Sequence, residues 1–481
     1  MTGNKTLAQQ ALEQGNGILR LAPTWVPRSF CRPGKRIKLH PADYNILGAR
    51  GGIDERWFSS TTWAENGPGT PEDEGLSYVV VSDTEKILLR DVVELLGADV
   101  IGQTLWNKYH RWAMFSKFFD NAGPLPHHMA RGSITERWFA STIAAQNGPT
   151  AKADEGMAYV CVDYHSDVKF RLKDAVRILG AELVGEELME KYNGWPMYSK
   201  FFDNQAPLFH HLHLKFEDAA RVGKLGKPEC YYFPKQLNNH TGESNYTYFG
   251  FDPDVTKEQV KERIAKFSDD DTRITDLSRA YRIQLGTGWY TPAGVIHAPA
   301  SVLTYEPQWN SDVNSVYENI VSGEVYPPEM LDEELPEGKK TLDDVIALLD
   351  WDKNVDPHYR KHYFREPIVE AENEQYTSKW ITYANPYIAA KELTVNPGQT
   401  VTIRDGAAYG CIFIQGHGKF GVYDAESPTV LHFGQQSSDE FFVSEQASVK
   451  GVTITNLSKV EPLVLLKHFG PNCPGVPQQV L

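Results

Sequence analysis

The pattern of hydrophobic and polar residues differs between the two ends of this chain. In residues 376–481, short runs of β-branched and aromatic residues are separated by turn residues, such as Asn396-Pro397-Gly398-Gln399. This spacing is typical of strands, and it predicts them at 401–403, 410–414 and 463–466. In residues 50–213, strand-like runs alternate with helical segments that are apolar on one side. The pattern predicts a mainly β protein with inserted helices.

An internal repeat lies in the N-terminal half. Residues 50–58 (RGGIDERWF) recur at 131–139 (RGSITERWF), and residues 116–120 (SKFFD) recur at 199–203. Each copy is expected to contain strands and one short amphipathic helix that ends at a glycine, Gly97 or Gly180. Two copies are too few for a solenoid, so a duplicated N-terminal α+β unit is expected.

The chain of 481 residues is long enough for several domains. We expect residues 1–130 to hold an N-terminal arm and the first copy of the repeat. Residues 131–330 are expected to form a metal-binding catalytic domain, and residues 331–375 a helical linker. Residues 376–481 contain no His-x-His pair, so a metal-free β domain is expected there, as a structural part or an oligomer surface.

One set of residues has the composition of a metal site. His211 and His213 are two residues apart, so on a strand both side chains point to the same face. Glu229 follows after room for a turn and a return strand, and His297 follows the turn at Pro292-Ala293-Gly294. Imidazoles with a carboxylate suit Zn²⁺, and also Mn²⁺, Fe²⁺ or Ni²⁺.

A simpler interpretation of the same residues is structural. A buried histidine is often a core residue that is satisfied by hydrogen bonds, and Glu229 alone could pair with Lys227 on the surface. The metal hypothesis therefore requires the four residues to meet in one place.

The region 131–330 resembles class I mannose-6-phosphate isomerases, which are zinc-dependent cupins. The resemblance lies in His213, in Lys227-Pro228-Glu229 and in the segment 292–298 (PAGVIHA), in that order. It implies a bicupin, two jelly-roll barrels, with metal ligands His211, His213, Glu229 and His297. The family often has glutamine where this chain has His211.

The resemblance also implies a reaction, the interconversion of an aldose and a ketose. Such a reaction needs a base beside the metal, and the resemblance implies Glu306 as that base, with Lys227 to stabilise charge. The family has an arginine after its Asn-Ser-Asp segment, which helps to hold phosphate. Here Asn310-Ser311-Asp312 is followed by 313–319 (VNSVYEN), without arginine. The substrate is thus a sugar or a sugar phosphate, and the missing arginine favours a neutral sugar.

Two other functions remain open at this point. The chain is alternatively a non-catalytic sugar-binding or regulatory cupin, or a cupin epimerase, lyase or dioxygenase. The first copy ends in His127-His128-Met129-Ala130 and has alanine where the second has His213. It is therefore expected to bind no metal and to act as a lid or a dimer surface, in a homo-oligomer.

The net charge indicates which partners to expect, and the cysteine content indicates the compartment. The formal net charge of −15 argues against binding to nucleic acid or to an anionic membrane. No apolar run is long enough to span a bilayer, and no signal peptide is visible. Five scattered cysteines suggest a reducing compartment. A cytoplasmic protein is expected.

Overall fold

The computed structural model describes residues 2–46, 55–64, 72–82, 85–119, 132–148, 151–162, 168–238, 244–322 and 324–480. The chain forms two compact units. The larger consists of residues 1–50, 126–322 and 326–481, and the smaller of residues 51–125 and 323–325. Antiparallel sheets dominate the larger unit, which confirms the predicted mainly β class. Within the described ranges, no helix is both long and apolar enough to cross a membrane.

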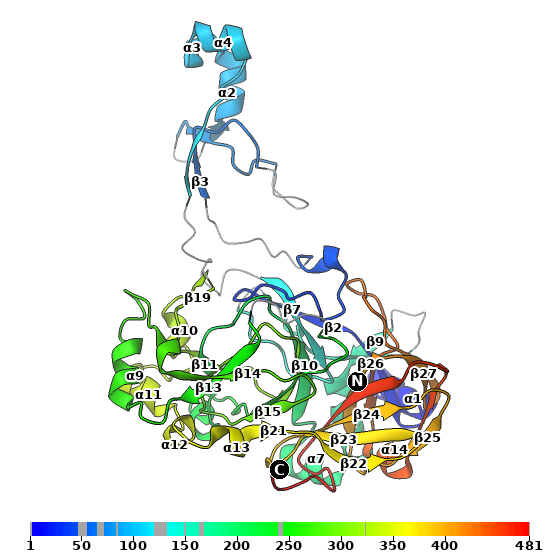
Figure 1. Ribbon diagram of the computed structural model, residues 1–481. Coiled ribbons are helices and arrows are strands. Elements are labelled where there is room, and N and C mark those ends of the chain that lie inside the picture. The colour runs from blue at the N-terminus through cyan, green and yellow to red at the C-terminus, as the bar shows by residue number, and fades with distance from the viewer. Residues whose placement is uncertain are drawn as a thin grey trace. The chain divides into compact units, whose positions relative to one another are not determined.

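The first barrel of the larger unit is made of two sheets (Figure 1). The seven-stranded sheet has the order β2 (Thr24–Arg28), β7 (Ser133–Phe139), β10 (Met197–Phe202), β17 (Thr304–Trp309), β12 (Glu229–Tyr232), β15 (Gly288–Thr291), β21 (Phe364–Arg365). The five-stranded sheet has the order β14 (Ser278–Arg282), β13 (Tyr246–Phe251), β16 (His297–Ala298), β11 (His211–Leu212), β18 (Ser315–Val316). Tyr231 and Trp289 from one sheet pack with Phe249 from the other in one apolar cluster.

The second barrel contains most of the C-terminal part. Its four-stranded sheet has the order β25 (Thr400–Ile403), β30 (Val452–Asn456), β27 (His417–Phe420), β28 (Tyr423–Glu426). Its nine-stranded sheet has the order β22 (Ile368–Glu372), β23 (Tyr376–Thr382), β24 (Ala389–Val395), β31 (Leu463–Phe469), β26 (Tyr409–Gln415), β29 (Glu440–Val443), β1 (Ile18–Ala22), β8 (Tyr159–Cys161), β9 (Lys169–Arg171). The predicted strands lie in β25, β26 and β31. The pattern missed one short helix, α14 (Glu445–Lys450), whose first turn is capped by the Ser444 hydroxyl.

The N-terminal arm joins both barrels. Strand β1 pairs with β29 of the second barrel and with β8, and β2 pairs with β7 of the first. Side chains from the two barrels also share one apolar cluster, in which Tyr305 and Phe201 pack with Leu466 and Ile412. The arm thereby brings Arg28, at the end of β2, to the first barrel.

Helices cover the outer face of the five-stranded sheet. Leu212 lies between the two histidines, so its side chain points away from theirs, and it packs with Val260 and Ile264. Two of the covering helices begin at capping boxes, Thr256 and Thr341. The helices of this region are α8 (Phe216–Ala220), α9 (Lys257–Ile264), α10 (Glu329–Asp332), α11 (Leu342–Ala347), α12 (Trp351–Asn354) and α13 (Tyr359–Tyr363).

The second copy of the repeat is part of the larger unit. Its helices α5 (Leu172–Leu179), α6 (Ala181–Val184) and α7 (Glu186–Tyr192) pack with the N-terminal helix α1 (Thr2–Gln14) in one apolar cluster. The sequence predicted one short helix per copy, and the structure has three. Gly180 and Gly185 have positive φ angles of 54° and 91°, and each ends a helix.

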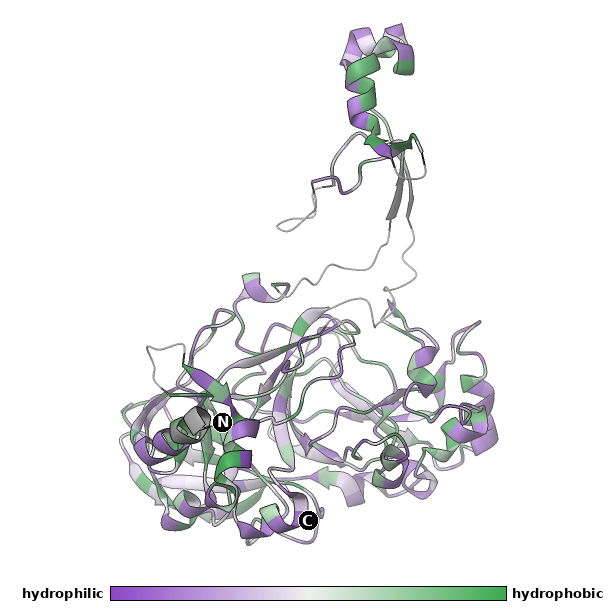
Figure 2. Ribbon diagram, turned by 180° about the vertical axis from the view of Figure 1, so that it is seen from behind, coloured by the Kyte–Doolittle hydropathy of each residue, from purple (hydrophilic) through white to green (hydrophobic). Residues whose placement is uncertain are grey.

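The first copy is the smaller unit. Its strands β3 (Glu55–Phe58) and β6 (Ser116–Phe119) pair with each other, as do β4 (Tyr78–Val80) and β5 (Lys86–Leu88). The helices α2 (Leu89–Leu96), α3 (Ala98–Ile101) and α4 (Gln103–Tyr109) follow. Figure 2 shows hydrophobic and hydrophilic residues side by side along α2.

Candidate metal centre and its pocket

Three histidines of the first barrel converge. His211 in β11 lies directly opposite His297 in β16, and His213 follows two residues later. One potential ligand atom from each histidine lies within 4.8 Å of the others, and all three side chains are buried. Glu229, at the start of β12, enters from the opposite sheet. Its Oε2 lies 2.9 Å from His213 Nε2, and its Oε1 lies 3.2 Å from His297 Nε2. The four residues named from the sequence therefore meet in one place.

Hydrogen bonds fix the orientation of all three imidazoles. Nδ1 of His211 lies 3.1 Å from the Phe209 carbonyl oxygen, and Nδ1 of His213 lies 2.7 Å from that of Val313. Nδ1 of His297 lies 2.9 Å from the carbonyl oxygen of Val295. A carbonyl oxygen only accepts, so each Nδ1 carries the hydrogen and each neutral ring leaves a lone pair on Nε2.

This arrangement brings acceptors face to face. The Nε2 lone pairs of His213 and His297 point at the Glu229 carboxylate. Lys227 Nζ donates to His213 Nε2 at 3.0 Å and lies 3.2 Å from Glu229 Oε2, whereas His297 Nε2 has no hydrogen-bond partner. A second proton on His213 would resolve the conflict, but burial lowers the pKa of His213 to about 4. Burial would raise the pKa of Glu229, yet the ammonium of Lys227 holds it well below its ordinary value. A cation between these atoms would satisfy all of them, so the residues fit a metal ion.

Two lysines and a second glutamate lie beside this cluster. Glu306 in β17 is directly opposite Lys200 in β10, and its Oε1 lies 3.3 Å from Lys200 Nζ and 3.8 Å from Lys227 Nζ. Lys227 Nζ also lies 3.2 Å from Glu229 Oε2. Burial and the nearby Glu229 raise the pKa of Glu306 well above its ordinary value, against the two lysines. Glu306 and Lys227 thus lie beside the histidine cluster, as the sequence suggested.

A pocket opens onto these groups. His211, His213, Glu229, Glu306 and Lys227 line it. Its other lining residues are Arg28, Phe30, Glu136, Lys200, Phe202, Leu208, Phe209, Tyr231, Pro299, Asp312 and Asn314.

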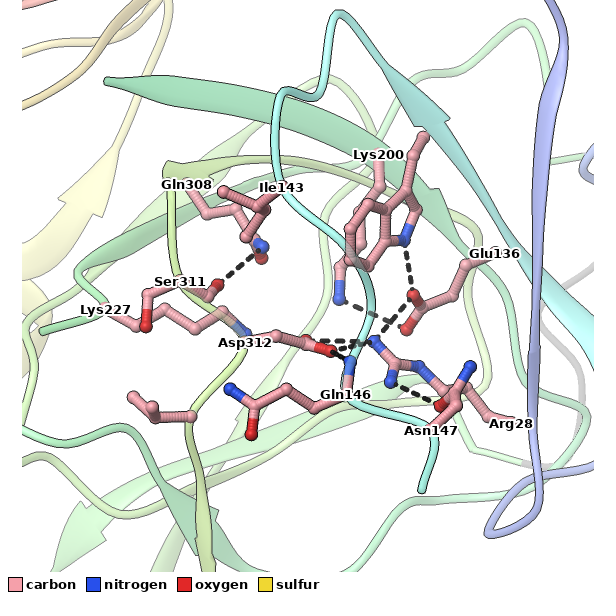
Figure 3. Close-up of polar contacts among 12 residues, drawn as sticks. Arg28, Glu136, Ile143, Gln146, Asn147, Lys200, Lys227, Gln308, Ser311 and Asp312 are labelled. Carbon is pink, nitrogen blue, oxygen red and sulfur yellow. Dashed lines mark hydrogen bonds and ion pairs between the residues drawn. The ribbon is translucent and has the colours of Figure 1, made fainter. Parts of the chain in front are cut away.

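Figure 3 shows the polar network on the side of the pocket where Arg28 lies. The sequence named Glu136, Lys200 and Asp312 only as parts of segments and assigned them no role. One signal would have pointed to Lys200, namely a charged residue within the mostly apolar run of β10. Arg28 had no such signal, because only the pairing of β2 with β7 brings it near residues more than a hundred positions away.

Another histidine pair lies away from this centre. His40 and His432 stack at 4.1 Å between ring centroids, and His432 Nδ1 lies 2.9 Å from Asp43 Oδ2. Nδ1 of His40 accepts a hydrogen bond from the Ala42 N–H, so a neutral His40 has its proton on Nε2. The hydrogen bonds of this pair hold an exposed loop, and they do not leave lone pairs facing one another. The residues His127, His128 and Ala130, from which a metal-free first copy was predicted, lie outside the described residues.

Comparison with known proteins gives structural likeness only. No protein-family model and no curated protein matches the sequence. The mannose 6-phosphate isomerase of Bacillus subtilis aligns with 70% of this chain and 90% of its own, at 17% identity and a TM-score of 0.49. A variant of phosphomannose isomerase from Salmonella typhimurium aligns with 71% and 92%, at 11% identity and a TM-score of 0.48. A mannose 6-phosphate isomerase with zinc bound also covers 71% and 92%, at 10% identity and a TM-score of 0.48. Both the identities and the TM-scores are low, so the case for a function rests on the side chains of this chain itself.

Proposed function

We propose that the larger unit is a metal-dependent isomerase that interconverts an aldose and a ketose. The proposed ligands are His211, His213, Glu229 and His297. Three imidazoles and a carboxylate suit Zn²⁺, and Mn²⁺, Fe²⁺ or Ni²⁺ would also accept them. A bound divalent metal supplies Lewis-acid polarisation of a substrate carbonyl.

Glu306 is proposed as the base. Isomerisation takes a proton from the carbon beside a carbonyl and returns it to the neighbouring carbon, so a single carboxylate can carry it both ways. The raised pKa of Glu306, caused by burial and by Glu229, makes its carboxylate a stronger base than an exposed glutamate. Lys227 and Lys200, within 4 Å of Glu306, orient the carboxylate, and Lys227 can stabilise negative charge on a substrate oxygen.

One observation carries this proposal. The proposed base and the four proposed ligands belong to one buried cluster, and all but His297 line the pocket directly. A purely structural metal site would need neither a pocket nor a base beside it.

Proton exchange tests the reaction. The metal-loaded protein is incubated in heavy water with free and phosphorylated aldoses and ketoses, and NMR follows deuterium beside the carbonyl. We expect incorporation in the wild type and a loss on the order of 100-fold or more in Glu306→Gln. Glu392→Gln is the matched control, since Glu392 accepts a bond from Tyr232 and does not line the pocket. If no sugar exchanges although metal is bound, the proposal fails and a sugar-binding protein is favoured.

Metal analysis of His297→Ala tests the centre itself. We expect the metal content to fall while the thermal unfolding of the metal-free protein stays unchanged. Unchanged metal content would remove His297 from the ligand set, and unfolding of the variant would favour a structural role.

A further inference from the structure

Each cation that lines the pocket already has carboxylate partners. Lys227 lies within 4 Å of Glu229 and Glu306, and Lys200 lies within 4 Å of Glu136 and Glu306. Arg28 Nη2 lies 2.9 Å from Asp312 Oδ1 and 3.1 Å from Glu136 Oε2. No lysine or arginine on the pocket wall is therefore left uncompensated among the described residues.

Arg28 is the most tightly held of the three (Figure 3). Its Nη2 donates to both oxygens of Asp312 and to Glu136, and its Nη1 donates to Asn147 Oδ1 at 2.9 Å. The guanidinium also lies over the rings of Phe30 and Trp138, at 5.6 and 5.7 Å. Its Nε has no hydrogen-bond partner and is buried. Carboxylates thus occupy Nη2 and an amide oxygen occupies Nη1, so the two-pronged donor edge that would clamp a phosphate is already in use.

The partners of Arg28 are themselves fixed. Asp312 Oδ2 accepts from the backbone N–H of Gln146 at 2.9 Å, and Glu136 Oε2 accepts from Trp138 Nε1 at 2.6 Å. Burial would raise the pKa of Glu136, but Arg28 and Lys200 lower it to about 2. The charges of Arg28 and Lys200 are thus matched by those of Glu136 and Asp312, so this corner offers an anion no uncompensated cation.

A sugar phosphate carries a charge of about −1.5 to −2 at neutral pH. Entering this corner, its phosphate would have to displace a buried carboxylate from Arg28 and would face two carboxylates without a solvent screen. The hydroxyls of a free sugar can donate to carboxylate oxygens and meet no such repulsion. Five apolar residues complete the wall and suit the C–H faces of a sugar ring: Phe30, Phe202, Leu208, Phe209 and Pro299.

We infer that this pocket selects uncharged sugars over sugar phosphates, and that Asp312 sets the preference by neutralising Arg28. The inference deepens the proposed function, because it rests on the pocket being a sugar site. No arginine directly follows Asp312 in the sequence. The structure has an arginine in the pocket, supplied by the N-terminal arm, and it is already paired.

Binding by the wild type is the first test. The Zn²⁺-loaded full chain is titrated with D-mannose, D-fructose, their 6-phosphates and inorganic phosphate, and dissociation constants are measured by ligand-observed NMR. We expect the free sugars to bind at least about tenfold more tightly than the phosphates. Tighter binding of either sugar phosphate overturns the inference. Because binding needs no turnover, a preference for free sugars without deuterium exchange would reject the isomerase and keep the inference.

Asp312→Asn tests the residue. The amide keeps the shape and removes the charge, so Arg28 becomes available to an anion. The ratio of phosphate to free-sugar affinity should rise by at least about tenfold. Asp405→Asn is the matched control, because Asp405 is an equally buried carboxylate paired with Lys391 and Lys467 in the other barrel. An unchanged ratio in a folded Asp312→Asn protein overturns the role of Asp312. If that variant does not fold, the wild-type titration still decides the preference.

Discussion

The two copies of the repeat have the same local structure and different surroundings. In the first copy Glu55 pairs with Phe119 across β3 and β6, and in the second Glu136 pairs with Phe202 across β7 and β10. The first pair of strands forms a sheet of its own. The second lies inside the seven-stranded sheet, next to β2 and β17, and there Glu136 and Lys200 line the pocket.

The exposure of matching apolar side chains shows the consequence. Leu179 and Met197 of the second copy are 7% and 0% exposed, and Leu96 and Met114 of the first are 48% and 58% exposed. The repeated sequence therefore encodes the strands and helices, and the neighbours decide which residues become core or site. Because the two copies match position by position, each supplies control variants for the other.

The largest difference in stability between matching variants is expected at the arginine that both copies contain. Arg137 is fully buried and donates to both oxygens of Asp439, at 2.9 and 2.7 Å. Arg137→Ala removes the nearest cation from that buried carboxylate and leaves Lys38 at 3.8 Å. It should therefore cost about 3–5 kcal/mol of unfolding free energy, measured by denaturant titration. Arg56→Ala makes the same change in the first copy. It should leave the unfolding free energy of the larger unit within about 0.5 kcal/mol of the wild-type value. Equal losses would show that the copies have equivalent roles.

A smaller difference is expected in the apolar face of the helices. Leu179→Ala removes a side chain from the cluster that α5 shares with α1, and we expect a loss of about 2–4 kcal/mol. Leu96→Ala, at the matching position, should cost less than about 1 kcal/mol, because nearly half of that side chain is exposed. A large loss in Leu96→Ala would mean that this face is covered in solution, and would break the comparison.

Substitution of the lysine in the repeated Ser-Lys-Phe-Phe-Asp segment is expected to lower activity in the second copy only. Lys200→Met removes a charge within 3.3 Å of Glu306 and Glu136, so sugar-dependent deuterium exchange should fall on the order of 100-fold, equivalent to about 2.7 kcal/mol. Near-ultraviolet circular dichroism checks that the variant is folded. Lys117→Met should exchange at the wild-type rate. If both variants lose activity equally, the first copy also contributes to catalysis.

These matched positions also show what local pattern can predict. Alternating apolar and polar residues, together with turn residues, predicted the strands of the second barrel. They could do so because the apolar pattern of a half-buried strand determines which of its side chains face the core. The same logic joined His211 and His213, and order along the chain added Glu229 and His297. The predicted helix end at Gly180 is confirmed. The helix count per copy was wrong, because a short apolar pattern does not reveal the two further helices that Gly185 separates.

The sequence did not predict which strands pair when they lie far apart along the chain. Arg28 and Asp312 are 284 positions apart in the sequence and bind each other because β2 pairs with β7. No local sequence pattern predicts that pairing. Similarly, the two copies look alike in sequence, and only the pairing of β10 with β17 makes Lys200 a partner of Glu306. Residues whose roles depend on distant strands were therefore the ones left without a role.

The smallest effect on stability is expected from the largest change, deletion of residues 51–125. No cluster of buried apolar side chains in the described part of the chain includes a residue of that segment. The shortened chain should therefore keep its metal and unfold within about 0.5 kcal/mol of the full chain. The hypothesis that the first copy is a lid or a dimer surface adds a demand, because it requires a change in exchange rate or in the mass measured by light scattering. A shortened chain with unchanged rate, mass and stability would reject that hypothesis, and a lower unfolding free energy would show that the first copy packs on the barrels after all.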